Sequence, residues 1–199
     1  MNLNENSSNV LVLASTSPRR RQLLEKAGID FIVDTQEVDE SPLPNEQPAE
    51  LVARLAKLKA QAVKTRHPKQ FVLGADTVVI LGQKTFGKPH SMLEATDFLR
   101  QLSGRTHQVL TGVAIISADN VLKNWVATTS VAFRQLDDDA IRRYFEHTSP
   151  LDKAGAYGIQ DHGELIVESI SGSLSNIIGL PVEDVLFHLA NLGFTNKPT

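Results

Sequence analysis

The chain contains no cysteine, and this absence excludes several kinds of chemistry at once. Disulfide bonds, thiolate zinc sites and cysteine nucleophiles all require a residue that the sequence lacks. A chain without thiols is compatible with a reducing compartment.

Long apolar runs and an excess of positive charge are also missing. No stretch approaches the roughly 20 apolar residues of a membrane-spanning helix, so we expect no membrane association. Residues 1–9 are polar and rich in Asn and Ser, unlike a signal peptide, so we expect a cytoplasmic protein. The net charge is −3, which argues against a nucleic acid polymer as a partner.

The composition is that of an ordinary globular protein, with 41% hydrophobic and 22% charged residues in a chain of 199. Short apolar strands alternate with amphipathic helices, and a hairpin around residues 118–120 follows. This order predicts an α/β fold with a mixed sheet. The expected strands are 9–14, 31–34, 71–81, 108–117, 121–134 and 167–170, and the expected helices are 18–26, 48–66, 93–102, 137–146 and 181–192. Within the second helix, the apolar spacing places Lys64 largely away from the buried face.

A basic segment, Ser15-Thr16-Ser17-Pro18-Arg19-Arg20-Arg21, follows the first strand. Ser17 is suited to cap a helix, and Pro18 fits the first helical position. The free N–H groups of a helix N-terminus, together with arginines, form a site for phosphate groups. Arginines are unfavourable beside the positive end of a helix dipole, so an anionic ligand would compensate them. The alternative is a capped helix with a solvated basic first turn.

An acid stands inside an apolar strand, in Gly74-Ala75-Asp76-Thr77. Burying a carboxylate costs several kcal/mol unless it is paired or bound to a metal. Asp76 is therefore a candidate for metal binding or for taking a proton from water. The alternative places Asp76 at a bulge at the strand end, bonded to backbone.

A pair of acids, Asp39 and Glu40, lies in a loop that also contains two prolines. Carboxylate oxygens are the ligands that Mg²⁺ prefers, so the pair is a candidate metal site. The alternative is a solvated acidic loop.

The segment 82–88 has the spacing GxxxxGK, but Pro89 stands where a phosphate-binding P-loop needs Ser or Thr. The sequence therefore excludes a P-loop. Lys88 is still able to contact phosphate as a point charge, and the alternative is a hairpin or loop lysine.

The segment 152–160 is rich in small residues that allow close approach to a ligand. Tyr157 and Gln160 add hydrogen-bonding groups to it. The alternative is an ordinary glycine-rich loop.

Taken in order, these segments resemble the Maf family of nucleoside triphosphate pyrophosphatases. The matching pieces are LASTSPRRRQLLEKAGIDF, VDE, RLAKLKA, LGADTVV, GKP, LSGRTHQVLTGVAI, DKAGAYGIQ and IIGLP. The resemblance implies an elongated α/β fold of two lobes with a central cleft, similar to inosine triphosphate pyrophosphatases. We expect a single catalytic domain over residues 10–194, a polar extension over 1–9 and a tail over 195–199.

The resemblance also implies an activity, which is hydrolysis of nucleotides between the α- and β-phosphates with a divalent cation, Mg²⁺ or Mn²⁺, in a homodimer. It makes Asp76 the proton acceptor that activates water, with Glu40 and Asp76 at the metal. The residues implied to contact the triphosphate are Ser15, Arg20, Lys59 and Lys88.

Three positions bear on the substrate. Arg19, Thr77 and Gln160 match the dTTP/UTP pyrophosphatase pattern, whereas relatives that favour 7-methyl-GTP carry Trp, Gln and an acid there. A neutral amide both donates and accepts hydrogen bonds, as a pyrimidine edge requires. We expect an enzyme that clears non-canonical or excess nucleotides. The alternatives are a pyrophosphatase for modified purine nucleotides and a nucleotide-binding regulator of cell division and septum formation.

Overall fold

The computed structural model describes residues 10–196, and these residues form two compact units. Unit 1 contains the described residues up to Asp76, then Thr111–Ala127, then the residues from Gly179 onward. Unit 2 contains Thr77–Leu110 and Thr128–Ile178. The expected polar extension over residues 1–9 lies outside the described residues.

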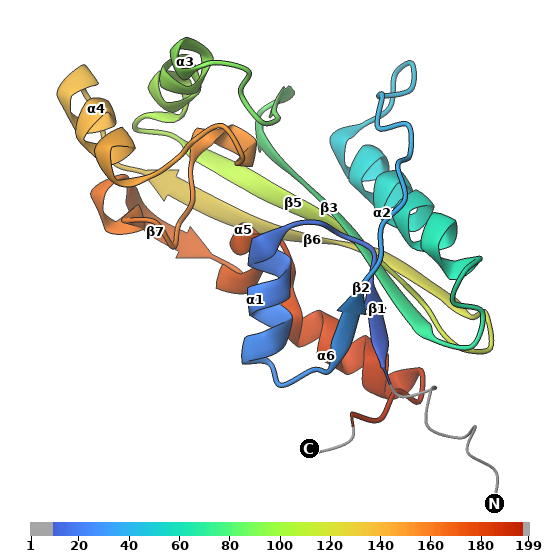
Figure 1. Ribbon diagram of the computed structural model, residues 1–199. Coiled ribbons are helices and arrows are strands. Elements are labelled where there is room, and N and C mark those ends of the chain that lie inside the picture. Colours follow the sequence, from blue (N-terminus) through green and yellow to red (C-terminus); the bar gives the residue numbers. More distant parts are fainter. Residues whose placement is uncertain (1–9, 197–199) are drawn as a thin grey trace, which may run out of the picture. The chain divides into compact units, whose positions relative to one another are not determined.

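The strands form one mixed sheet with the order β2-β1-β3-β5-β6-β7, and β4 pairs with β3 (Figure 1). β1 pairs in parallel with both β2 and β3, while β4 and β7 pair antiparallel with their neighbours. This confirms the expected α/β class.

The strands are β1 Leu11–Leu13, β2 Phe31–Val33, β3 Phe71–Leu81, β4 Lys84–Phe86, β5 Thr106–Ile116, β6 Leu122–Phe133 and β7 Val167–Ser171. The helices are α1 Pro18–Lys26, α2 Pro48–Lys64, α3 Met92–Leu102, α4 Asp138–His147, α5 Leu174–Ile178 and α6 Val182–Asn191, with short 3₁₀ helices at Ala154–Ala156 and Gly163–Leu165.

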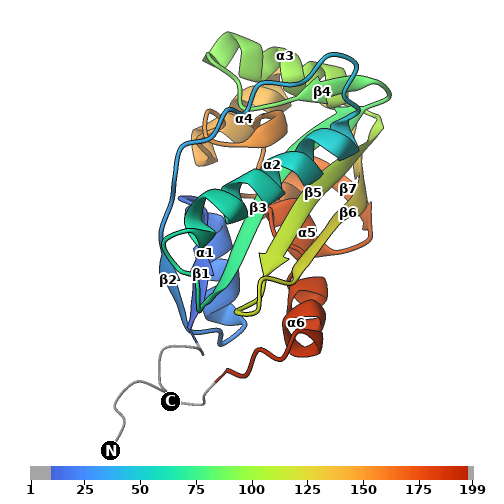
Figure 2. The same cartoon turned by 90° about the vertical axis from the view of Figure 1, so that its right-hand side faces the viewer.

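Two glycines allow α2 to lie directly on the sheet in unit 1 (Figure 2). A Cβ atom at Gly74 would collide with the backbone at Ala56, and one at Gly112 would collide with the backbone at Val52. Side chains two residues apart in a strand share a face, so Asp76 points to the same side as α2. Gly74 therefore lets α2 lie close to the strand on the side to which Asp76 points.

Helix α6 covers the opposite face of the sheet in unit 1. Asn124 of β6 donates its side-chain N–H to the carbonyl of Ala53 on α2. The next residue, Trp125, packs against His188 of α6 with ring centroids 4.4 Å apart. Successive strand residues point to opposite faces, so α2 and α6 sandwich this part of the sheet.

The GxxxxGK segment forms a hairpin in unit 2. β4 pairs antiparallel with the end of β3, and Gly82 in the turn has a φ of 62°, a conformation that suits glycine. The exclusion of a P-loop is therefore confirmed. The apolar core of unit 2 contains Val79, Phe86, Leu99, Phe133 and Tyr144.

The expected exposure of Lys64 is wrong. Its side chain is buried, and its ammonium donates three hydrogen bonds of 2.7 to 3.0 Å, to the carbonyls of Pro68, Gln70 and Ser117. These bonds use all three ammonium protons and tie the end of α2 to the β5–β6 hairpin. Within residues 10–196, no helix is long and apolar enough to cross a membrane.

Candidate active site

Lys59 of α2 lies between two carboxylates. Its Nζ atom is 2.7 Å from Oδ1 of Asp76 and 2.7 Å from Oε1 of Glu40. Asp76 lies in the middle of β3, and Glu40 lies in the loop after β2, so three distant segments meet here. The interpretation of Asp76 as a strand-end acid bonded to backbone is wrong, because β3 continues to Leu81 and the carboxylate pairs with an ammonium.

The two acids of the loop, Asp39 and Glu40, have different partners. Glu40 contacts Lys59, whereas Asp39 Oδ1 accepts a hydrogen bond of 2.9 Å from the N–H of Ser41. Hydrogen bonds from Ser41 lower the pKa of Asp39. Asp39 therefore shapes the loop, and Glu40 is the acid that reaches the cluster.

A second cation, Arg20, is buried beside the start of α1. Its Nε donates to the carbonyl of Gly179 at 2.9 Å, and its Nη1 donates to Oγ of Ser15 at 3.0 Å. Burial lowers the pKa of Arg20, while the charges of Asp76 and Glu40 act in the opposite direction. A guanidinium stays protonated in proteins, so Arg20 brings a fixed positive charge to these two acids.

The N-terminus of α1 is capped differently from the sequence expectation. Ser17 occupies the cap position without a side-chain capping bond, and its N–H donates to Oγ of Ser15 at 3.3 Å. The first turn of α1 contains no acid to balance the positive end of the helix dipole. Ser15, Arg20 and this helix end together suit an anionic ligand such as a phosphate group.

Unit 1 thus brings together five of the expected residues, which are Ser15, Arg20, Glu40, Lys59 and Asp76. Arg19 is half-buried in the same first helical turn as Arg20. Thr77 follows Asp76 directly in β3 and is the first residue of unit 2. The roles expected for all of these residues stay predictions.

Lys88 and Gln160 are exposed residues of unit 2. The N–H of Gly155 donates to the carbonyl of Gly87 at 3.0 Å, which places the glycine-rich segment beside the residue that precedes Lys88. The two expected ligand-binding segments of this unit are therefore neighbours. Their contacts with a substrate also stay predictions.

Tyr144 of α4 holds the loop that carries Gln160, and the sequence analysis missed it. Burial raises the pKa of Tyr144 to about 12, so its hydroxyl stays protonated and is able to donate and accept. It hydrogen-bonds both backbone groups of Gly158. On the other side of Gln160, Asp161 lies 3.2 Å from Nζ of Lys153. Nothing in the helical pattern around Tyr144 signals this long-range contact.

Tyr157 is part of the core of unit 2. Its side chain is buried, and its hydroxyl lies 2.8 Å from Nε2 of His107. Both rings also pack edge-on against Phe133. Tyr157 therefore anchors the loop to the core of unit 2. Its hydroxyl is engaged with His107, which corrects the expectation that it is available to a ligand.

Two acids of unit 1 lie close enough together to serve a divalent cation. Among residues 10–196, no three His, Cys, Asp or Glu side chains converge as a complete metal site. Glu40 and Asp76 do converge, because both contact the same ammonium. Mg²⁺ is commonly held by one or two carboxylates, several waters and substrate phosphates, so this pair fits such a cation.

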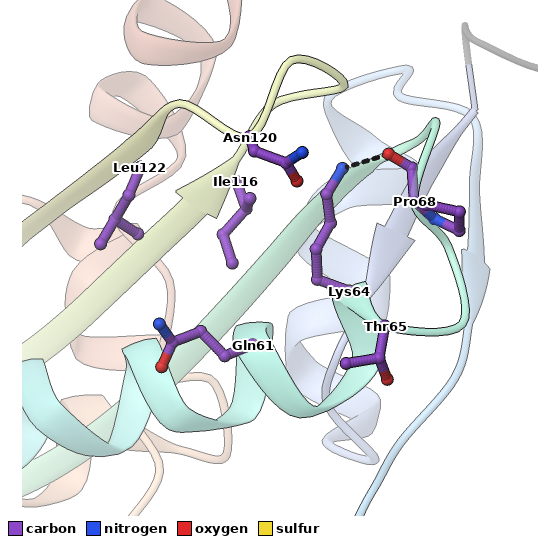
Figure 3. Close-up of a pocket in the computed structure, with 7 residues that line it drawn as sticks. All are labelled: Gln61, Lys64, Thr65, Pro68, Ile116, Asn120 and Leu122. Atoms are coloured by element: carbon purple, nitrogen blue, oxygen red, sulfur yellow. Dashed lines mark hydrogen bonds between the residues drawn. The ribbon is translucent and has the colours of Figure 1, made fainter.

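A separate cavity of about 430 Å³ lies near the end of α2 (Figure 3). Among residues 10–196, no carboxylate lines it, and the charged group that does, Lys64, already donates to three carbonyls. Its composition gives no sign of the acid–cation chemistry of the cluster around Lys59. The lining residues are Gln61, Lys64, Thr65, Pro68, Ile116, Asn120 and Leu122.

Comparison with known proteins gives a consistent result over most of the chain. The family described as "Maf-like protein" matches residues 10–192. A relative from Akkermansia muciniphila, named dTTP/UTP pyrophosphatase, is 48% identical over an alignment of 187 positions that covers 92% of this chain and 97% of that protein. A relative of the same name from Pyrococcus furiosus is 42% identical, and the alignment covers 94% of this chain and 97% of that protein.

One solved structure, the Staphylococcus aureus Ham1 protein, aligns with a TM-score of 0.54 over 91% of this chain and 98% of that one. The sequence identity is 14%, so this likeness concerns the fold alone. It agrees with the mixed α/β architecture described above.

Proposed function

Because the chain belongs to the Maf family, we propose that it is a nucleoside triphosphate pyrophosphatase that hydrolyses dTTP and UTP to the monophosphate and pyrophosphate. Two observations together carry the proposal. Relatives named dTTP/UTP pyrophosphatase align with this chain over nearly its whole length, and the chain brings Lys59, Asp76 and Glu40 together in one cluster. The biological purpose would be the removal of non-canonical or excess nucleotides.

The triphosphate is expected to meet fixed positive charge. Arg20 offers a guanidinium already oriented by Gly179 and Ser15, and the start of α1 offers a positive helix end. Lys59 and, from unit 2, Lys88 would add ammonium groups as point charges. Phosphoryl chemistry depends mainly on such positioning and charge neutralisation, so these residues suit the reaction.

Asp76 is the proposed proton acceptor for the attacking water. Its position in the middle of a long strand fixes the carboxylate, and one oxygen is held by Lys59 at 2.7 Å. Glu40 and Asp76 would hold a divalent cation, Mg²⁺ or Mn²⁺. Such a cation, when bound, neutralises phosphate charge and orients the water.

Selection of the base is assigned to Arg19, Thr77 and Gln160. Gln160 is exposed on a loop held at Gly158 and Asp161, so its amide would be presented in a defined position. An amide is able to pair with both the donor and the acceptor of a pyrimidine edge. Homodimer formation and a cytoplasmic location also belong to the proposal.

The test is a panel of triphosphates, including dTTP, UTP and 7-methyl-GTP, incubated with the purified protein and Mg²⁺ or Mn²⁺ while pyrophosphate release is measured. Asp76→Asn is the informative variant. Asp97→Asn is its matched control, because Asp97 is an exposed acid of α3. We expect release from dTTP and UTP that is lost in Asp76→Asn and unchanged in Asp97→Asn.

The other outcomes separate the alternatives. Release only from 7-methyl-GTP or another modified purine would keep the reaction and overturn the substrate assignment. No release from any nucleotide with either metal would favour the regulator of cell division. A regulatory effect that survives Asp76→Asn would show that regulation is independent of catalysis.

A further inference from the structure

The loop that carries Glu40 has no helix or strand between Val33 and Pro48, yet its acid reaches Lys59 at 2.7 Å. We propose that Arg54 of α2 is a positioning residue that clamps this loop and thereby sets where Glu40 meets Lys59 and Asp76. The inference rests on the proposed function, because it concerns the geometry of that catalytic cluster.

Arg54 and Glu46 form a forked ion pair at the end of the loop. Nε of Arg54 is 2.6 Å from Oε1 of Glu46, and Nη2 is 2.8 Å from Oε2. The Glu46 side chain is only 6% exposed and that of Arg54 is 23% exposed. The hydrogen bonds from Arg54 lower the pKa of Glu46 to about 2. Two parallel bonds in a largely buried setting fix orientation as well as distance.

The clamp extends to the residue beside Glu40. Nη2 of Arg54 also donates to the carbonyl of Ser41 at 3.0 Å, and Oε2 of Glu46 accepts from the N–H of Leu43 at 3.0 Å. On the other side of Glu40, Asp39 binds the N–H of Ser41. The backbone flanking Glu40 is therefore held by Arg54 directly and by the Glu46 side chain that Arg54 orients.

The same helix supplies both the clamp and the cation. Arg54 and Lys59 are five residues apart on α2, which corresponds to roughly 7.5 Å along the helix axis. Because one rigid element presents both side chains, holding Ser41 at Arg54 also determines how Glu40 approaches Lys59. A lysine at position 54 would keep the charge and lose the fork that makes three contacts possible.

The start of the loop is attached elsewhere. Arg66, just beyond α2, forms a forked pair with Asp34 at 2.8 and 2.9 Å, and His67 contacts the same carboxylate at 2.8 Å. Arg66 also donates to the side chain of Gln36 and to the carbonyl of Thr35, so these contacts end four residues before Glu40. They fix where the loop leaves β2 and leave the positioning of Glu40 to Arg54.

The first measurement is independent of activity. We expect Arg54→Gln to speed hydrogen exchange at the N–H groups of Ser41 and Leu43, with no change in β3. The matched control is Arg100→Gln, which removes a forked Arg–Asp pair between α3 and Asp138 in unit 2. Unchanged exchange at Ser41 and Leu43 would overturn the clamp whether or not the protein hydrolyses nucleotides.

The second measurement is a double-mutant cycle on kcat for dTTP. We expect Arg54→Gln to lower kcat roughly tenfold to hundredfold, since small displacements of reacting groups are that costly. In a Glu40→Gln background the same substitution should change kcat by less than about twofold, because its effect passes through Glu40. If the two losses multiply in the double variant, Arg54 acts independently of Glu40, and the proposal would fall. Wild-type protein without any activity would instead overturn the proposed function, and hydrogen exchange would still decide the clamp.

Discussion

The hydroxyl of Tyr144 accepts a hydrogen bond of 2.9 Å from the N–H of Gly158 and donates one of 3.1 Å to its carbonyl. Both backbone groups of one loop residue are therefore held by one side chain, two positions before Gln160. A loop held in this way presents its side chains with little freedom. Selection of the base would consequently depend on a residue in α4 that need not touch the substrate.

Tyr144→Phe removes both hydrogen bonds and leaves the ring in place. We expect the preference for dTTP over a purine triphosphate to fall several-fold and the free energy of unfolding to fall by about 1–3 kcal/mol. The preference is measured as the ratio of the two kcat/KM values. Tyr157→Phe is the matched control, because it loses the contact with His107 and leaves Gly158 held. An equal loss of preference in both variants would contradict a specific role for Tyr144.

Gly74→Ala inserts a methyl group against the backbone of α2 at Ala56. We expect the free energy of unfolding to fall by about 3 kcal/mol, the upper part of the range for overpacking, because rigid backbone cannot move aside cheaply. Denaturant unfolding measures it. Gly87→Ala should change stability little, since a Cβ there meets open space. Retained stability in Gly74→Ala would show that α2 lies farther from β3 than described.

His107 predicts a dependence of stability on pH. Burial lowers its pKa to about 4, below the ordinary value of 6.5, so the unfolded chain binds a proton more readily than the folded one. The free energy of unfolding should therefore fall as pH drops from about 6.5 towards 4, by up to roughly 3 kcal/mol from this residue. Above that window the contribution is constant.

Urea unfolding at pH 7 and pH 5 measures this contribution. His107→Gln keeps a polar side chain near Tyr157 and removes the titrating group, so its stability should change less between the two pH values than that of the wild type. An identical change in both proteins would assign the pH dependence to other residues.

The strands and helices were largely predictable because their signals are local. The apolar run of β3 and the periodicity of α2 give both elements close to their observed bounds. β4, with three residues, and α5, with five, were not predicted, since such short segments carry almost no periodic pattern. The exposure expected for Lys64 was wrong because carbonyls of the α2–β3 connection and of the β5–β6 hairpin supply its partners.

The candidate site, too, was predictable where its signal is local and unpredictable where it depends on tertiary contacts. A carboxylate inside an apolar strand indicates that Asp76 has a partner, and the sequence supports that much without a structure. Asp76 shares Lys59 with Glu40 because α2 packs on β3 at Gly74. This packing is a tertiary contact, which the local sequence does not reveal. Arg54 and Tyr144 escaped prediction for the same reason, since each acts on a loop residue distant in the chain. Their role depends on which way a helical side chain points after packing.

Lys64 has a practical consequence for chemical labelling. An amine must expose its nitrogen and lose a proton before it reacts with an acylating reagent. Lys64 as a residue is only 7% exposed, and its three ammonium protons are held by carbonyls. Lysines on the surface should therefore be modified long before it. Acylation of Lys64 would report the moment when the end of α2 separates from the β5–β6 hairpin, which makes this side chain a built-in probe of local opening.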